Sequence, residues 1–307
     1  MPWVLIYLVN ILSFFKTIKA PVSGADLAVV VTTYNRPEAL AWTLASLSQQ
    51  SVMPRQILVA DDGSGDETKQ MVLCWARYFR ERHAHTVVEH VWQDDLGFRA
   101  GAARNLAVEH ATKNMNPEVL IFIDGDCIAS PSFVRNHLGL LTEGVMVAGG
   151  RGLLSPNYTR GLEQTALNAE PQDIVSGLSV FASPFRLWLS NNCDRYLSMQ
   201  HWMSSAFLKL RDSRPRDDKL VRTCNLSVRY ADFRRVGGFN EAFIGWGLED
   251  TELAVRLIAG GVRVRSGRFA TNVFHMWHAE RSRADLDENA HRLALSRQHT
   301  SPSNLRG

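Results

Sequence analysis

The sequence predicts an α/β fold with one mostly parallel sheet and helices on both of its faces. Apolar, β-branched runs such as Leu27–Thr33 are typical of strands buried on both sides. Segments with apolar residues at helical spacing alternate with these runs, which favours parallel strands joined by right-handed crossovers. Polar clusters follow four of the runs, at the carboxyl ends of strands where such sheets bind ligands.

The expected elements begin at residue 27 and follow in order. Pro37 opens a helix with Leu40, Leu44 and Leu47 on one face. The next elements are a strand over 56–60, a helix carrying Met71, Trp75 and Phe79, a strand over 86–92, a helix over 100–111 and a strand over 119–123. Regular structure returns at 224–229 and in a helix over 249–259, which Gly260 ends.

A looser pattern at 155–220 indicates an insertion within a single domain that spans residues 24–285. Residues 185–210 mix aromatic and polar side chains and are expected to be helical. Residues 211–219 are charged, contain proline and are expected to be mobile. The polar residues 286–307 form an expected peripheral tail.

Composition excludes several classes of protein. The hydrophobic fraction of 45% and the charged fraction of 21% are typical of a globular protein. A net charge of +3 without a basic run argues against a nucleic-acid partner. The four cysteines form no C-x-x-C pair, which argues against a zinc site and favours reduced thiols in a cytosolic protein.

The N-terminal segment 1–23 contains an apolar run at residues 4–15. Its helical length of about 18 Å is short of the roughly 30 Å hydrocarbon core, so we expect a helix that lies in the membrane interface. A helix packed on the domain's own surface is the alternative. Lys16 and Lys19 favour the cytoplasmic side, so the expected location is the inner face of a bacterial cell membrane.

Asp124-Gly125-Asp126 ends the most apolar predicted strand. Carboxylates two residues apart on an extended backbone point the same way, and Gly125 allows a tight turn between them. Two such oxygen ligands suit Mn²⁺ or Mg²⁺, which would stabilise a departing nucleoside diphosphate. Solvated aspartates in a strand-end turn are the alternative.

Asp61-Asp62-Gly63-Ser64 follows the second strand. A carboxylate here can accept the imide N–H of uracil, and Tyr34 is placed to pack against the base. A turn without a ligand is the alternative, because Asp-Gly is a common turn pair.

The stretch at 97–105 opens a helix and carries Arg99 and Arg104. Two arginines at a helix N-terminus favour a diphosphate or sugar hydroxyls. An arginine paired with Asp94 or Asp95 is the alternative.

Trp246 lies between Gly245 and Gly247, and this flexible backbone favours an exposed platform for a sugar ring. Glu249 and Asp250 follow at a helix start. Either could be the general base that deprotonates an acceptor hydroxyl, or both could only stabilise the helix dipole.

His275 and His278 would lie on opposite faces of a strand. We therefore expect one of them, His278, to be a third metal ligand.

These motifs resemble the inverting GT-A-type glycosyltransferases of family 2. VVVTTYNRPEAL, ILVADDGSGDET and FIDGDC occur in that family's order. The later stretch CNLSVRYADFRRVGGFNEAFIGWGLEDTELAVRL is similar to a module shared by β-1,4-galactosyltransferases and bacterial chondroitin-polymerase domains. The resemblance spans about residues 28–283, but 155–220 has no clear counterpart, so it does not imply an acceptor.

The resemblance implies a GT-A fold and a role for each motif. The nucleotide would contact Thr32, Tyr34, Arg36, Asp61 and Asp62, and the donor phosphates or sugar would contact Arg99 or Arg104 and Asp124. Asp126 would be the main metal ligand, supported by Asp124 and His278. Asp250 would be the catalytic base, with Glu249 beside it, and Trp246 with Gly245 would contact the acceptor. His275 stands where the galactosyltransferases carry methionine.

The expected function is metal-assisted, inverting transfer from a UDP-sugar to a carbohydrate or lipid-linked glycan in surface-polysaccharide synthesis. One rival is a non-catalytic, membrane-associated glycan-binding scaffold on the same fold. Another is a nucleotidyltransferase that makes sugar nucleotides. That enzyme would need a glycine-rich basic loop after the first strand, where this chain has TTYNRPEA.

Overall fold

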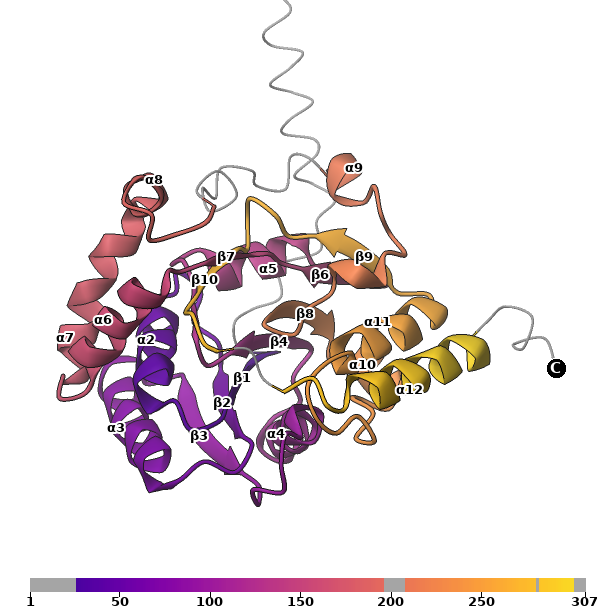
Figure 1. The fold of residues 1–307 in the computed structure, drawn as a ribbon, viewed down its shortest axis with the longest axis horizontal. Helices are drawn as coiled ribbons and strands as arrows, with labels where there is room; N and C mark the ends of the chain where they lie inside the picture. Colours follow the sequence, from indigo (N-terminus) through magenta and orange to yellow (C-terminus); the bar gives the residue numbers. More distant parts are fainter. Residues whose placement is uncertain (1–25, 196–207, 280–281, 301–307) are drawn as a thin grey trace, which may run out of the picture.

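A seven-stranded sheet forms the centre of the computed structural model, which describes residues 26–195, 208–279 and 282–300 (Figure 1). The strands are β1 (Leu27–Thr33), β2 (Gln56–Asp61), β3 (Val87–Trp92), β4 (Val119–Asp124), β6 (Val145–Ala148), β8 (Asn225–Arg229) and β9 (Arg263–Ser266). Their order is β3-β2-β1-β4-β8-β6-β9. Only β8 runs antiparallel to its neighbours β4 and β6 within the described sheet. The mostly parallel α/β sheet is therefore confirmed.

Helices cover both faces of the sheet (Figure 1). One face carries α2 (Pro37–Ser48), α3 (Asp66–Arg82) and α5 (Phe133–Leu140), with α6 (Pro156–Ala166) and α7 (Pro171–Gly177) packed on α2. The other face carries α4 (Ala100–Asn114), α10 (Tyr230–Arg235) and α11 (Glu249–Ala259), with α12 (Leu286–His299) packed on α11.

The residues of the central strands alternate between two hydrophobic cores. In β1, Val29 and Val31 belong to the core beside α2, whereas Ala28 and Val30 belong to the core beside α4. This alternation follows from the period of two along a strand, and both faces are apolar because helices cover both. A sheet buried in this way leaves its carboxyl-terminal edge as the place where polar residues can gather.

A second, three-stranded sheet lies next to this edge. It consists of β5 (Cys127–Ile128), β10 (Val273–His275) and β7 (Arg151–Leu153), with β10 in the middle. The antiparallel pairing of β10 with β5 places His275 opposite Cys127. The segment around His275 is thereby fixed beside Asp126.

The expected helix over 185–210 is only partly present. A 3₁₀ helix, η3 (Leu178–Ala182), leads into α8 (Pro184–Leu189), and α9 (Leu208–Arg211) follows later. Residues 190–195 are not helical, because Asn191 turns the chain with φ +56° and Cys193 pairs with Leu154. Residues 196–207 lie outside the described residues.

The charged stretch 211–219, expected to be mobile, is held in place. The guanidinium of Arg211 donates to the carbonyls of Ser266 and Arg268 at 2.8 Å each. Asp212 accepts from Arg265 at 2.7 Å, and η5 (Asp218–Leu220) follows. The charged side chains of Arg211 and Asp212 therefore pair with groups of the folded domain, which composition alone could not show.

The residues expected to form a polar tail begin with α12. Asn289 and Leu293 on this helix are buried, so residues 286–299 pack on the domain. The division of the chain at residues 23 and 285 stays a prediction. The apolar run at residues 4–15 lies outside the described residues, and none of the described helices is both long and apolar enough to cross a membrane.

Candidate active site

A cavity of about 690 Å³ opens at the carboxyl ends of β1, β2 and β4. Most of the site residues expected from the sequence line it. They are Thr32, Tyr34, Arg36, Asp62, Arg104, Asp124, Asp126, Trp246, Glu249, Asp250 and His278. Three others, Asp61, Arg99 and Gly245, are not among the lining residues. Segments more than 200 residues apart thus meet in one place.

Gly125 locks the Asp124–Asp126 turn against β1. Its N–H donates to the carbonyl of Thr32 at 2.7 Å. A Cβ at this position would lie 3.0 Å from that oxygen and 3.1 Å from Thr33 Cβ. Glycine is therefore required by close approach to the neighbouring strand, whereas the sequence suggested turn flexibility.

Arg36 links Asp126 to the insertion. Its Nη1 lies 2.7 Å from Asp126 Oδ2, and its Nη2 lies 2.6 Å from Glu163 Oε1 on α6. Nη2 also donates to the carbonyl of Trp277 at 3.1 Å. No sequence signal singled out Glu163, because one carboxylate on an amphipathic helix looks like any solvated charge.

Arg104 contacts Asp124, the other carboxylate of the turn. This buried side chain on α4 donates to Thr32 Oγ1 at 2.8 Å and to Asp124 Oδ1 at 3.1 Å. Its Nη1 lies 3.4 Å from Glu249 Oε1. Asp124 and Asp126 thus have separate cationic partners, although they are two residues apart.

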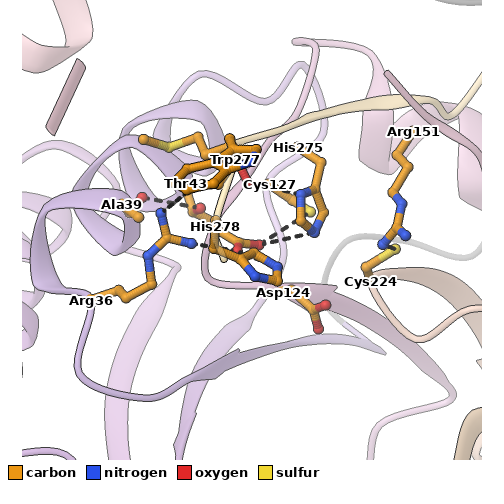
Figure 2. A network of polar contacts seen from close by, with 12 residues as sticks. Arg36, Ala39, Thr43, Asp124, Cys127, Arg151, Cys224, His275, Trp277 and His278 are labelled. Carbon is orange, nitrogen blue, oxygen red and sulfur yellow. Dashed lines mark hydrogen bonds and ion pairs between the residues drawn. The ribbon is translucent and has the colours of Figure 1, made fainter. Parts of the chain in front are cut away.

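The rings of His275 and His278 lie close together (Figure 2). Both reach Asp126, because the chain leaves the strand after His275. Nε2 of His275 lies 3.5 Å from Oδ1, and Nε2 of His278 lies 3.8 Å from Oδ2. The Nδ1 atoms lie 2.9 Å from the carbonyl oxygens of Met276 and Ala279 respectively. A carbonyl only accepts, so Nδ1 carries the proton in each ring, and a neutral ring then presents the lone pair of Nε2 to the carboxylate.

The two aspartates predicted to bind the nucleotide, Asp61 and Asp62, lie in different surroundings. Asp61 is fully buried, accepts from the N–H of Ser64 at 2.8 Å and lies 2.7 Å from His90 Nε2. Asp62 lines the cavity, and its oxygens accept from Gln93 Nε2 at 2.6 Å and from the N–H of Arg99 at 2.7 Å. Only Asp62 can face a base in the cavity, while Asp61 holds the turn.

Arg99 and Tyr34 both contact the loop that follows β3. Arg99 Nη2 donates to the carbonyl of Asp94 at 2.6 Å, which supports the structural alternative for this arginine. The hydroxyl of Tyr34 donates to Asp95 Oδ2 at 2.9 Å. Of the two arginines expected to bind the donor, only Arg104 lines the cavity.

The loop before α11 has an unusual backbone. Gly245, Gly247 and Leu248 all have positive φ, at +76°, +107° and +75°. The left-handed conformation of Leu248 costs about 1–3 kcal/mol, and such strain is most often found at functional sites. Gly245 donates its N–H to the carbonyl of Phe98 at 3.0 Å, and Trp246 lines the cavity at 39% exposure.

Glu249 and Asp250 have different surroundings at the start of α11. Burial and the charge of Asp250 raise the pKa of Glu249 to about 7. Burial also raises the pKa of Asp250, against the opposing charge of Arg222. Glu249 pairs with Arg104, whereas Asp250 uses Oδ1 to accept from the N–H of Thr251 at 2.7 Å. Asp250 is therefore the better placed of the two to accept a proton from a ligand.

Several residues that the sequence did not single out also shape the cavity. Asn289 on α12 donates to the carbonyls of Ile244 and Gly247 at 3.0 and 3.2 Å, which holds the Trp246 loop. Three further arginines contribute positive charge to the cavity wall: Arg151, Arg222 and Arg283. Isolated arginines carry no spacing signal, so a sequence alone could not group them.

Two known protein families match the two halves of this site. Glycosyl transferase family 2 matches residues 28–169, and the N-terminal domain of galactosyltransferase matches residues 211–279. The chain therefore contains a glycosyltransferase family 2 domain. Asp62 and Asp126 lie in the first matched region, and Asp250 and His278 lie in the second, so the cavity joins the two.

Relatives of this chain include a glucosyltransferase and a chondroitin synthase. It is 32% identical to validoxylamine A glucosyltransferase from Streptomyces hygroscopicus subsp. limoneus over 262 residues, which are 81% of this chain and 52% of the relative. It is 28% identical to chondroitin synthase from Escherichia coli, over 78% of this chain and 33% of the relative. The chain spans about half or less of the length of these relatives.

Solved structures of S. aureus TarS share the GT-A glycosyltransferase fold of this chain. TarS 1-349 in complex with UDP has a TM-score of 0.54 at 17% identity, over 90% of this chain and 68% of TarS. The complex with UDP-GlcNAc has the same TM-score and identity, over 90% and 69%. At this identity the likeness establishes the fold alone.

Proposed function

We propose that this chain transfers a sugar, with inversion, from a UDP-sugar to a hydroxyl of a carbohydrate or lipid-linked glycan acceptor in surface-polysaccharide synthesis. The observation that carries the proposal is the convergence of Asp62, Asp126 and Asp250 on one cavity. These residues come from three separate strand or helix ends. They supply, in order, a partner for a base, a ligand for a cation and a general base.

Asp62 and Tyr34 support recognition of the nucleoside. Asp62 lines the cavity with a carboxylate that can accept the imide N–H of uracil. Tyr34 follows the end of β1 and also lines the cavity, where its ring can contact the base. TarS, which shares the fold, is known in complex with UDP and with UDP-GlcNAc, and this favours a uridine donor here.

Arginines among the residues that line the cavity support binding of a diphosphate. Arg104 is held by three polar contacts of its guanidinium. Arg151, Arg222 and Arg283 also line the cavity. Arginine pairs well with phosphate oxygens because its donors form a planar fork. The positions of these arginines would orient the donor before transfer.

The types of donor atom that line the cavity suit a divalent cation. Asp126 and Asp124 offer oxygens, and His278 offers Nε2 on the cavity side. We propose that these three residues hold Mn²⁺ or Mg²⁺, and the imidazole nitrogen favours Mn²⁺, because Mg²⁺ takes oxygen ligands. When bound, such a cation stabilises negative charge on the departing diphosphate.

Asp250 and Trp246 support the acceptor side. The carboxylate of Asp250 would accept the proton of the attacking hydroxyl, and its raised pKa makes it a stronger base than an exposed aspartate. Trp246 offers a partly exposed ring from the strained loop, on which a sugar ring can stack. A cytoplasmic-face location, with residues 4–15 in the membrane interface, would suit a lipid-linked acceptor.

A donor screen tests the proposed function. The full chain is incubated with a panel of UDP-sugars, Mn²⁺ and glycan or lipid-linked acceptor extracts, and released UDP and product mass are measured. We expect release from at least one donor and a product heavier by one sugar residue. Absence of UDP release with every donor, in the presence of the extracts, would favour the non-catalytic scaffold.

A further inference from the structure

Trp277 is exposed beside the cavity, although its backbone is held on both sides. It follows β10, and 42% of the residue is exposed. Its N–H donates to Thr159 Oγ1 at 2.9 Å, and its carbonyl accepts from Arg36 Nη2 at 3.1 Å (Figure 2). Arg36 and the next residue along the chain, His278, line the cavity, whereas Trp277 is not among the lining residues. An aromatic residue is therefore fixed next to the cavity wall.

Helix α6 of the insertion fixes this position and places a carboxylate beside it. Thr159 and Glu163 are four residues apart on α6, so they share one face of the helix. Thr159 is buried and binds the backbone of Trp277. Glu163 Oε1 lies 2.6 Å from Arg36 Nη2, the same nitrogen that contacts the Trp277 carbonyl. Glu163 and Trp277 therefore meet at one atom.

Both residues keep a polar atom available for a ligand. Among the described residues, none accepts from Trp277 Nε1 and none donates to Glu163 Oε2. By contrast, Nε1 of Trp42 and Nε1 of Trp92 each donate to a backbone carbonyl. A single exposed aromatic residue is common on protein surfaces. Trp277 differs because its backbone is fixed and a half-buried carboxylate lies beside it.

This combination of groups suits a neutral sugar. One face of a pyranose ring consists of C–H bonds with small positive charge, and the face of an indole carries the negative part of its quadrupole. The hydroxyl groups at the edge of the sugar can donate to Glu163 Oε2 and accept from Trp277 Nε1. The charge of Glu163 is already paired with Arg36, so the pair favours no ligand of either sign.

We propose that Trp277 and Glu163 form a subsite for a second sugar unit of the acceptor glycan, next to the unit that contacts Trp246. This inference rests on the proposed function and restricts its acceptor to a glycan with a neutral sugar at the second position. Arg36 Nη1 lies 2.7 Å from Asp126 Oδ2, so one side chain separates the subsite from the proposed metal ligand. The insertion would thus select acceptors of at least two units.

Titration of the full chain with neutral sugars, followed by ligand-detected NMR in the absence of donor, tests this proposal. The probes are cellotriose, maltotriose and chitotriose, each compared with its monosaccharide. We expect at least one trisaccharide to bind roughly tenfold more tightly than its monosaccharide, which corresponds to about 1.4 kcal/mol. Trp277→Ala should remove this gain without changing the monosaccharide affinity, and Trp277→Phe should keep most of it. Trp188→Ala, at a similarly exposed tryptophan of α8, should keep all of it.

Three results would overturn the proposal. They are equal affinity for the two members of every pair, a gain that survives in folded Trp277→Ala, and a loss of UDP affinity in that variant. The last result would place Trp277 on the donor side. Circular dichroism shows whether each variant is folded, and Trp277→Leu replaces the alanine variant if that one unfolds. UDP titration with Mn²⁺ on the same samples tests the proposed function separately, since wild type that binds UDP but no trisaccharide refutes the subsite alone.

Discussion

At the scale of single residues, the two carboxylates at the start of α11, Glu249 and Asp250, have different contacts. Glu249 is tied to Arg104, which also holds Asp124, so its carboxylate belongs to the frame of the site. Asp250 lies beside Arg222 and keeps its contacts to Thr251. The two carboxylates are therefore adjacent in sequence but have different contacts in the structure, and we propose Asp250 as the base.

Asp250→Asn should retain UDP-sugar binding but lose transfer. An amide cannot accept the acceptor's proton, so we expect kcat to fall by about 10²–10⁴-fold with little change in the donor dissociation constant. Turnover and donor binding are measured separately. The matched variant Glu249→Gln should lose less turnover, and a larger loss in Glu249→Gln than in Asp250→Asn would reassign the base.

His137 should make stability depend on acid pH. It is buried, lies 2.9 Å from both Ser227 Oγ and Asn225 Oδ1, and burial lowers its pKa from 6.5 to about 4. Between these values the unfolded chain binds a proton that the folded chain does not, so stability falls as pH drops from about 6.5 to 4, by about 3 kcal/mol in total.

Urea unfolding at several pH values measures this effect. His137→Gln should remove that part of the slope, and His85→Gln, at an exposed position, controls for loss of a histidine. An unchanged slope in His137→Gln would show that other groups cause the acid sensitivity.

At the scale of elements, α12 supports the loop that carries Trp246 at the cavity. Asn289 is fully buried and donates to two carbonyls of the loop that carries Trp246. Leu286, the first residue of the helix, lines the cavity itself. The positive-φ conformation of Leu248 persists because this helix fixes the loop on its outer side.

Asn289→Ala should loosen that loop. Two partly buried carbonyls lose their donor, at a net cost of about 0.5–1.5 kcal/mol for each hydrogen bond. We expect a lower melting temperature and an acceptor KM that rises more than the donor KM. Glu288→Ala, on the exposed side of the same helix, should change neither, and equal rises in both KM values would show that α12 does not act through the loop.

Element length decided what the sequence could predict. β1 and β4 are continuous apolar runs covered on both faces, so their residues identify them. β5, β7 and β10 have only two or three residues, too few for any period to show, and their pairing depends on partners from distant segments. The sequence therefore predicted β1 to β4, but it missed β6 and β9 of the main sheet and the small sheet that brings His275 to Asp126.

The same limit applies to individual site residues. The predicted second strand ended at residue 60, whereas β2 includes Asp61. Since successive strand residues point to opposite sides, this one-residue difference separates a buried Asp61 from a cavity-lining Asp62. Asp126 and Asp250 lie directly at element ends, and for that reason the sequence could place them.

At the scale of the whole molecule, the N-terminal run should govern membrane association. Removing residues 1–20 deletes the apolar run at 4–15, which we expect to lie in the membrane interface. The truncated protein should no longer sediment with anionic vesicles, whereas removal of residues 301–307 should have no effect. Continued sedimentation after the N-terminal deletion would rule out this anchor.

The central claim is that carboxylates at one edge of a buried sheet bind a uridine diphosphate together with a divalent cation. Calorimetric titration of UDP into the full chain, with Mn²⁺ or with EDTA, tests it most directly. We predict at least tenfold tighter binding with Mn²⁺, loss of that gain in Asp126→Ala, and its retention in Asp173→Ala, an exposed residue of α7. Equal UDP affinity with and without Mn²⁺, or an undiminished gain in folded Asp126→Ala, would contradict the account.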